Sequence, residues 1–346
     1  PRPAASAPAP PSPTPPEPLA GVMLKWGGRA NRSNDLAEAL GLTLIELPWN
    51  TRRAWLVPLR YAVQWFASLR ALRQQLPGHG VIVAQHTQPF ASLAAWWHAR
   101  RTGGHLVLDC HNGPIVGRFE QSRLLRPIHR RLFARADAVL VHNEAVRRIA
   151  VEEQHLPGRF VVLHDPLPPH FTPGEPNDSS YALSVCSFAS DEPIQALWDA
   201  CEACPEIDVL VTGHPSRLPS ALRRSKPANV TLTGFMPHDE FVRTLRAASV
   251  AVALSNYEAV LMRAHHEALA AGVPMVTTDQ PVIRSYLADA AVYVEHRSRS
   301  IARGLREAMA ERASIRENAI RVAEQRRVEW SREAERVFRE VFADSR

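Results

Sequence analysis

The chain has few residues that could tie it together covalently. Only four of its 346 residues are cysteines, and two of these, Cys201 and Cys204, form one Cys-x-x-Cys pair with no second pair and no histidine nearby. Disulfide frameworks and structural zinc sites need more ligands than this. The sequence therefore predicts no metal site, and it indicates reduced thiols in a cytoplasmic protein.

Long apolar runs are also missing. No run reaches the roughly 18 residues of a membrane-spanning helix, and no run typical of a signal peptide opens the sequence. The chain is basic instead, with a net charge of +6, and of its 41 basic residues only Lys25 and Lys226 are lysines. A basic surface favours phosphate-bearing ligands and anionic membranes. No motif typical of nucleic-acid recognition appears.

Length and composition predict two domains. The chain is about twice as long as a typical domain, and it can bury roughly three quarters of its unfolded surface. Residues 1–18 are rich in Pro and Ala and have little to bury, so we expect a disordered tail. A stretch rich in Pro, Gly, Asn and Ser, residues 166–180, is interpreted as a linker. The predicted units are residues 19–168, residues 178–330 and a terminal helix over residues 331–346 that packs back on the first domain.

Short apolar runs alternate with helical patterns on both sides of the linker. Before it, five predicted strands begin at residues 21, 42, 80, 106 and 136. After it, strands begin at residues 181, 207, 230, 250, 273 and 290. This alternation is typical of α/β domains with doubly wound parallel sheets. Ligands of such sheets lie outside the carboxyl ends of the strands, so the loops after these strands form the candidate site.

Two glutamates follow the predicted strand at residues 250–254. Glu258 lies where the strand empties into a loop, and Glu267 lies one to two turns into the helix that follows. Gly272 and Pro274 are typical of a helix stop. Because the unit is strand, loop, helix and strand, both carboxylates can face one crevice at the carboxyl edge of the sheet.

This stretch resembles a known family. The run Glu-Ala-Leu-Ala-Ala-Gly-Val-Pro-Met-Val, which begins at Glu267, is similar to Glu-Ala-Met-Ala-Cys-Gly-Thr-Pro-Val-Val of retaining glycosyltransferases with the GT-B fold, family 4 (group 1) type. That fold has two Rossmann-like domains facing a cleft. The family holds a nucleotide sugar with two glutamates separated by seven residues. Eight residues separate Glu258 from Glu267, so the resemblance implies that Glu267 holds the ribose and that Glu258, displaced by one place, holds the sugar.

The resemblance also covers loops of the first domain. Gly27 and Gly28 lie between a strand and a helix N-terminus, where backbone N–H groups bind phosphate, although a tight turn would use the same residues. Arg29 and Arg32 either add charge there or are solvated. An Asp-x-His-Asn-Gly pattern implies that His111 approaches the donor sugar as a catalytic residue, although a histidine at a strand end is often structural.

The loops of the second domain supply the other implied donor contacts, Ser187, Gly213, Gly234 and Phe235. Gly234 and Phe235 either back the nucleobase or form a plain strand-to-helix turn. Many family members carry Arg and Lys in the loop after residue 186 to clamp the diphosphate, and this chain has neither. We expect Arg263, four residues before Glu267 on the same helix face, to supply this charge as a catalytic residue, with a surface ion pair as the alternative.

The resemblance implies transfer of a hexosyl unit from a nucleoside-diphosphate sugar to a glycan or lipid-linked acceptor, with retention and without a metal or other cofactor. A nucleotide-sugar epimerase of the same fold and a catalytically silent GT-B protein that binds a glycan or a partner remain alternatives. The amphipathic helix predicted over residues 58–76 carries Trp, Phe and Arg, which suits the inner face of an anionic membrane. We favour a core-packing helix with a basic rim there.

Overall fold

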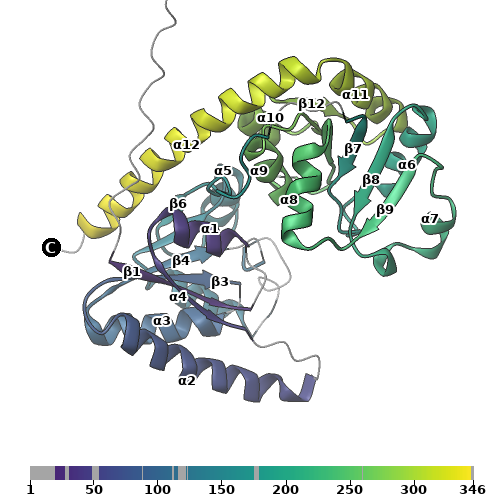
Figure 1. The fold of residues 1–346 in the computed structure, drawn as a ribbon. Coiled ribbons are helices and arrows are strands. Elements are labelled where there is room, and N and C mark those ends of the chain that lie inside the picture. The colour runs from purple at the N-terminus through teal and green to yellow at the C-terminus, as the bar shows by residue number, and fades with distance from the viewer. Residues whose placement is uncertain are drawn as a thin grey trace, which may run out of the picture.

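The computed structural model describes residues 20–27, 31–48, 54–87, 89–110, 113–115, 122, 124–174, 179–258 and 260–343. These residues form two parallel sheets of six strands each, one from each half of the chain (Figure 1). The strand order is β2-β1-β3-β4-β5-β6 in the first sheet and β12-β11-β10-β7-β8-β9 in the second. Helices flank both sheets, so the predicted architecture of two Rossmann-like domains is confirmed.

The first domain carries the sheet β1 to β6. Its strands are β1 (Gly21–Trp26), β2 (Thr43–Leu47), β3 (Val81–His86), β4 (His105–Cys110), β5 (Ala138–Val141) and β6 (Phe160–Val162). Its helices are α1 (Asn31–Ala39), η1 (Ala54–Leu56), α2 (Val57–Gln75), α3 (Pro89–Thr102), α4 (Arg126–Phe133), α5 (Glu144–Arg148) and the π-helix η2 (Ile149–Glu153). The sequence predicted five strands; the sixth, β6, has only 3 residues, which is too short to show a period of its own.

The second domain carries the sheet β7 to β12. Its strands are β7 (Tyr181–Ser184), β8 (Asp208–Thr212), β9 (Val230–Gly234), β10 (Val250–Ala253), β11 (Met275–Thr278) and β12 (Ala291–Val294). Its helices are α6 (Ile194–Ala203), η3 (Pro215–Arg217), α7 (Ser220–Arg224), α8 (His238–Ala247), α9 (Arg263–Ala270), α10 (Pro281–Leu287) and α11 (Ser298–Ala310). The last helix, α12 (Arg312–Ala343), begins here and continues to the first domain.

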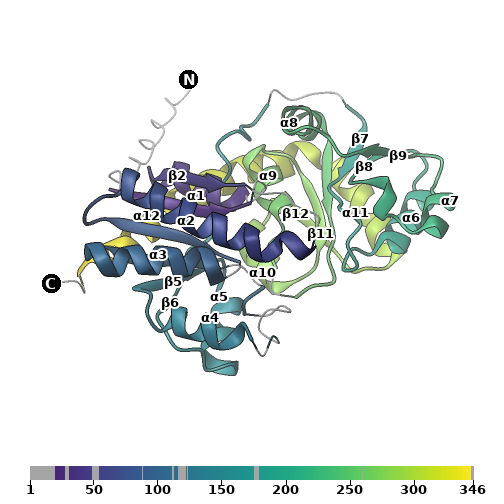
Figure 2. The same cartoon turned by 90° about the horizontal axis from the view of Figure 1, so that it is seen from below.

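Both faces of the first sheet are covered, which explains why every residue of β3 is buried. One face packs against α1 and the end of α12, through side chains such as Leu36 and Phe338. The other face packs against α2, α3 and α4, through side chains such as Leu72, Ala95 and Phe133. Seen from below, α2 and α3 lie in front of the sheet and α12 lies behind it (Figure 2).

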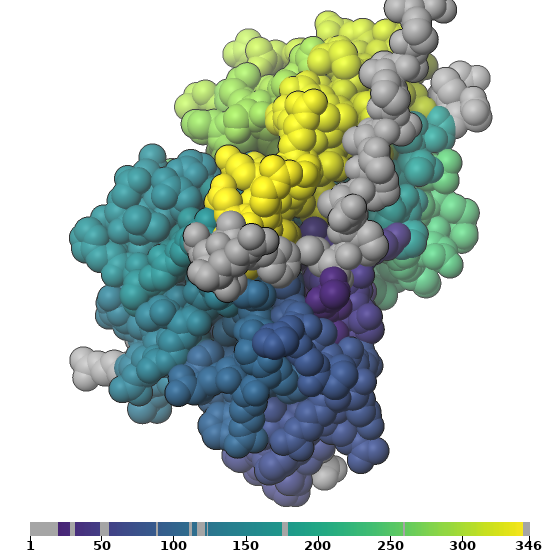
Figure 3. Space-filling model, turned by 90° about the vertical axis from the view of Figure 1, so that its left-hand side faces the viewer, coloured from purple at the N-terminus to yellow at the C-terminus, as the bar shows by residue number. Residues whose placement is uncertain are grey.

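The helix α12 joins the two domains. Its first turns place Ala319 and Val322 in the core of the second domain, and its later turns place Ala334 and Phe338 in the core of the first. Trp330 donates from its indole Nε1 to the carbonyl of His164 at 2.9 Å. Figure 3 shows this helix, in yellow, running over the surface from one domain to the other. The carboxyl edges of both sheets thereby face the same space.

The helix α1 begins at Asn31, and Arg32 in its first turn is anchored to neighbouring strands. The helix α6 begins at Ile194, with Pro193 at the N-cap position and no side-chain cap hydrogen bond. The helix α2 packs on the first sheet through Leu72, as expected, but the other two residues that it buries, Gln64 and Ser68, are polar. Three of its large apolar side chains, Leu59, Val63 and Phe66, are exposed.

Candidate functional site

A cavity of about 1050 Å³ lies between the carboxyl edges of the two sheets. The first domain lines it with residues that follow β5 and β6, and the second domain with residues that follow β10, β11 and β12. The residues that line it include Asn143, Glu144, Arg148, Glu258, Asp279 and His296. The cavity is therefore built at the place where parallel sheets bind ligands.

The loop after β10 presents Glu258 to this cavity. Ser255 is buried, and its hydroxyl donates to Asp191 Oδ2 at 2.5 Å. The backbone N–H of Asn256 donates to the carbonyl of Asp191 at 2.7 Å. On the other side, Gln280 donates from its side chain to the carbonyl of Tyr257 at 3.1 Å. The loop is thus held to the neighbouring loops on both sides, and the exposed carboxylate of Glu258 projects from a fixed backbone.

Glu267 and Arg263 lie on α9 and contact each other. The guanidinium of Arg263 donates from Nε to Glu267 Oε1 at 3.0 Å and from Nη1 to Asp35 Oδ2 on α1 of the first domain. Glu267 is 5% exposed. Arg263 therefore joins two carboxylates from two domains, rather than forming the solvated surface pair that the sequence left open.

Burial changes the protonation of Glu267. Removal from water raises the pKa of Glu267 to about 7, the nearby Arg263 charge opposes this rise, and Asp35 adds to it. Burial also lowers the pKa of His265 to about 4 and lowers that of His266 further. The helix α9 therefore holds two neutral imidazoles and a carboxyl group whose pKa lies near neutral pH.

The sequence left open whether Arg32 is solvated. In the structure Arg32 is buried and paired with carboxylates. Its Nε donates to Asp109 Oδ1 at 2.7 Å, and Nη1 pairs with Asp165 at the end of β6. This cluster anchors α1 to β4 and to the segment that follows β6. His111 and Gly28 themselves lie outside the described residues.

The loop after β7 binds a carboxylate of its own chain. Glu192 accepts hydrogen bonds from the backbone N–H groups of Ser187 at 2.9 Å and of Ala189 at 3.0 Å. The hydroxyl of Ser187 also donates to Glu192, at 3.2 Å. Backbone N–H groups arranged in this way can hold an anion. Ser187 is exposed. Its backbone N–H and hydroxyl, which the sequence assigned to the sugar nucleotide, donate to Glu192 instead.

The predicted glycines fall into two kinds. Gly213 has a φ of +101°, and a Cβ added there would meet the Cys186 carbonyl oxygen at 2.6 Å. Its role in this structure is close packing. Gly27 and Gly234 also have positive φ, of +101° and +78°, but no atom lies within 4 Å of an added Cβ, so both border open space. Phe235, next to Gly234, is 70% exposed.

The chain matches family descriptions along most of its length. Residues 170–326 match Glycosyl transferases group 1. Residues 27–166 match the Glycosyl transferase 4-like domain. The chain belongs to the group 1 glycosyltransferases of the GT-B fold. Among curated proteins, none matches this glycosyltransferase at a significant level.

Solved structures show the same fold at low sequence identity. HepE from Anabaena in complex with UDP and glucose superposes with a TM-score of 0.69 at 14% identity, over 93% of this chain and 99% of that one. Sucrose-phosphate synthase from Thermosynechococcus elongatus gives 0.63 at 17% identity, over 87% and 84% of the two chains. A glycosyltransferase from Rickettsia africae gives 0.61 at 12% identity, over 93% and 90%.

Several cavity residues of this glycosyltransferase were not singled out from the sequence. Asp279 directly follows β11, and His296 follows β12 by two residues. Their place after a strand is the signal that could have found them. Arg148 gave no such signal, because it enters the cavity from the last turn of α5. In the part of the chain that the structure describes, Arg148 has no hydrogen-bond or salt-bridge partner.

The cysteines of the glycosyltransferase are buried free thiols. Burial raises the pKa of the Cys201 thiol to about 12, so the thiol stays protonated and is a poor metal ligand or nucleophile. Within the described ranges, no group of three or more His, Cys, Asp or Glu side chains could hold a metal ion. No helix among the same residues is long and apolar enough to cross a membrane.

Proposed function

We propose that this glycosyltransferase moves a hexosyl unit from a nucleoside-diphosphate sugar to a glycan or lipid-linked acceptor, with retention at the anomeric carbon. The observation that carries the proposal is that Glu258 projects into a cavity of about 1050 Å³ between the carboxyl edges of two Rossmann-like domains. The complex of the structurally similar HepE with UDP and glucose supports a nucleotide-sugar donor. We also propose a peripheral contact with an anionic membrane, because a lipid-linked acceptor lies there.

The roles proposed for the two glutamates follow from their surroundings. Glu258 is exposed to the cavity, and a carboxylate that accepts two sugar hydroxyls orients the ring. Glu267 is buried beside Arg263 and is proposed to accept the ribose hydroxyls. This requires the donor to reach α9, so we propose that donor binding separates Arg263 from Asp35.

Negative charge grows on the leaving diphosphate during transfer, and groups fixed around it lower the barrier. The N-terminus of α9 supplies part of the positive potential, and Arg263 in its first turn supplies a full charge. Arg148, which lines the cavity in the first domain, adds a second cation, whereas Arg263 is not among the residues that line the cavity in this structure. We assign no covalent nucleophile, and we propose that the reaction needs no metal or other cofactor. His111 is proposed as the group that approaches the sugar from the first domain.

A donor panel tests the proposal. The protein is incubated with uridine- and guanosine-diphosphate sugars and a mixture of glycan and lipid-linked acceptors, and the products are identified by mass spectrometry. Proton NMR of the product then reports the anomeric configuration. A product with the configuration of the donor supports the proposal, and an inverted product contradicts retention. A rearranged nucleotide sugar formed without an acceptor would identify an epimerase instead.

One observation favours a second candidate, a catalytically silent GT-B protein that binds a glycan or a partner. Glu192 occupies the N–H groups of the loop after β7, and that loop carries neither Arg nor Lys. Calorimetric titration with uridine diphosphate and guanosine diphosphate separates the two candidates. Binding of either one supports the transferase, and binding of neither supports the silent protein.

A further inference from the structure

The helix α2 exposes one apolar stripe, and two of the three residues that it buries fully, Gln64 and Ser68, are polar. Trp55, just before α2, is 72% exposed, and along the helix Leu59 is 54%, Val63 43% and Phe66 70% exposed. These positions are spaced by three or four residues, so they form one stripe along the helix. A surface helix of a globular protein normally turns such a stripe toward the core.

The buried side of α2 explains why the stripe faces outward. Gln64 donates from its side-chain nitrogen to the carbonyl of Leu47 at 2.8 Å. Ser68 accepts a hydrogen bond from the indole of Trp26 at 2.8 Å and donates to the Gln64 carbonyl at 2.7 Å. These bonds satisfy the polar groups that face the sheet. The orientation of α2 is therefore specified from inside, and the outward face does not arise from a missing contact with the core.

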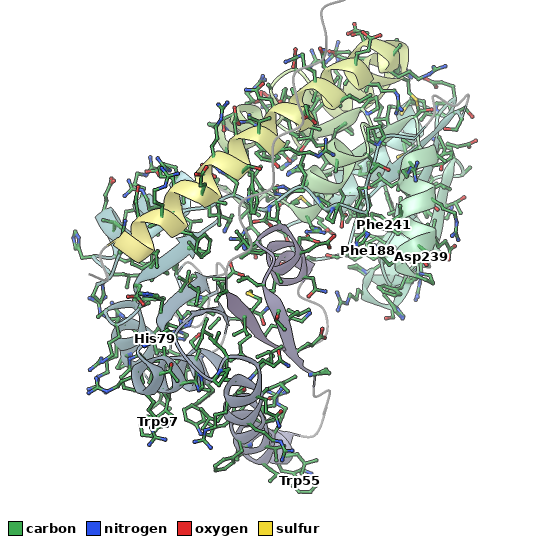
Figure 4. All side chains as sticks on the ribbon, turned by 60° about the vertical axis from the view of Figure 1, so that its left-hand side comes forward. Trp55, His79, Trp97, Phe188, Asp239 and Phe241 are labelled. Carbon is green, nitrogen blue, oxygen red and sulfur yellow. The ribbon has the colours of Figure 1, made fainter. Side chains whose placement is uncertain are left out.

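Positive charge surrounds the stripe. The same helix face continues at Arg70 and Arg73, which are exposed. The adjacent helix α3 carries exposed Arg100 and Arg101, and the Arg101 guanidinium lies 4.3 Å from the centre of the Trp97 ring. Between Glu46 and Asp109 the sequence has seven arginines and no acidic residue. Figure 4 shows Trp55 and Trp97 pointing away from the molecule at the same lower end.

We propose that this surface, defined by Trp55, Leu59, Val63, Phe66, Arg70 and Arg73, docks on an anionic lipid bilayer. An apolar stripe with aromatic side chains enters the region between head groups and acyl chains, while arginines beside it pair with lipid phosphates. A second copy of the chain fits less well. A symmetric contact through the stripe would bring arginines against arginines, with no carboxylate on α2 or α3 to compensate.

The surface and the cavity lie at opposite ends of the strand order of the first sheet. Trp55 follows the edge strand β2 by eight residues, whereas the first domain lines the cavity with residues that follow β5 and β6. Membrane binding itself does not depend on the proposed transfer reaction, so the two proposals can fail separately.

Vesicle flotation tests the proposal without any sugar nucleotide. Wild-type protein is mixed with vesicles of phosphatidylcholine alone or of phosphatidylcholine with phosphatidylglycerol. We expect binding to the anionic vesicles, weakened by salt, and much weaker binding to the neutral ones. Wild-type protein that floats with neither vesicle would overturn the proposal.

Comparison of stripe variants with matched control variants tests whether the stripe is responsible for vesicle binding. Leu59→Gln/Phe66→Gln should lower the vesicle partition coefficient at least about tenfold. The control Val151→Gln/Ile320→Gln changes two helical side chains that are also partly exposed, at 36% and 39%, and should leave binding unchanged. Arg70→Gln/Arg73→Gln should lower binding about thirtyfold, and more than Arg332→Gln/Arg336→Gln, which removes the same net charge from α12. Equal binding by test and control variants would contradict the proposal.

A second measurement keeps the test independent of folding defects. Vesicles with brominated acyl chains should quench wild-type tryptophan emission and quench it less in Trp55→Phe. Unchanged quenching in that variant would contradict insertion of the stripe. Light scattering of the wild-type protein in solution tests whether a second copy of the chain covers the stripe instead.

A wild-type dimer that becomes monomeric in Leu59→Gln/Phe66→Gln, together with no vesicle binding, would show that the stripe is a dimer interface. This result would overturn the lipid assignment.

Discussion

The guanidinium of Arg263 reaches from the second domain to the carboxylate of Asp35 in the first. The two residues are 228 positions apart, and their side chains are 25% and 8% exposed. Arg263 also contacts Glu267 on its own helix. The charge proposed for the diphosphate is therefore shared with two carboxylates in this structure, and we expect a bound donor to compete with Asp35 for it.

Substitutions of Asp35 and of Arg263 should change the affinity for a nucleoside diphosphate in opposite directions. Asp35→Asn should tighten binding of the preferred nucleoside diphosphate about threefold to tenfold, because Arg263 no longer gives up an ion pair. Arg263→Gln should weaken it by about tenfold or more, as expected for a charge-assisted contact. Isothermal titration calorimetry measures both. Asp289→Asn, which breaks the exposed pair with Arg321, is the control and should change nothing. Unchanged affinity in both test variants would remove Arg263 from the diphosphate site.

Variants of Glu267 and Glu258 should differ in their effects on activity and on nucleotide affinity. Glu267→Ala should abolish donor hydrolysis and transfer while the protein stays folded, because Arg263 keeps Asp35 as a partner. Glu258→Gln should lower transfer by about a hundredfold with little change in nucleoside-diphosphate affinity, because Glu258 is proposed to contact only the sugar. Coupled assays and calorimetry on the same preparations separate the two effects, with Glu307→Ala on α11 as control. Full turnover in Glu267→Ala would end its assignment.

Stability should depend on pH through Glu267. Its pKa is raised to about 7 in the folded protein, against about 4.3 in an unfolded chain. Between these values the folded state holds a proton that the unfolded state has released. The contribution of Glu267 to the free energy of unfolding is therefore full below about pH 4.3 and is lost as the pH rises through about 7, by on the order of 4 kcal/mol.

Thermal melts over this pH range check the sign. We expect the melting temperature of the wild type to fall relative to that of Glu267→Gln as the pH rises, because the glutamine cannot release a proton. Arg263 and Asp35, the charges beside Glu267, are present in both proteins. Glu307→Gln, at an exposed position on α11, should follow the wild type. Parallel curves for wild type and Glu267→Gln would show that Glu267 is ionised throughout.

Two glycines of the proposed donor site should respond differently to alanine. Gly213→Ala combines a positive φ with a Cβ that meets the Cys186 carbonyl, so it should cost about 3 kcal/mol or more in the free energy of unfolding. Gly234→Ala adds a Cβ in open space and should cost about 1 kcal/mol, from backbone strain alone. Chemical denaturation measures both. Equal losses would contradict the assignment of Gly213 to close packing.

The sequence determined the parts of this protein that depend on local periodicity. Buried parallel strands read as continuous apolar runs, so β1, β3 and β10 were placed to within a residue or two. Gly272, with a φ of +64°, ends α9 as predicted, because only a residue without a Cβ takes that conformation cheaply. The order of strands and helices, and with it the two-domain fold, follows from these local patterns.

Tertiary structure alone decided the partners of the charged groups and the direction in which α2 faces. Arg263 was predicted on the correct helix face, but Asp35 is far away in sequence, and only the packing of the two domains brings it within reach. Glu192 has no local pattern that marks it as the anion of the loop after β7. The apolar stripe of α2 was visible in the sequence. Its exposure depends on a hydrogen bond that Gln64 donates to the carbonyl of Leu47 and one that Ser68 accepts from the indole of Trp26, and no periodicity reports these partners.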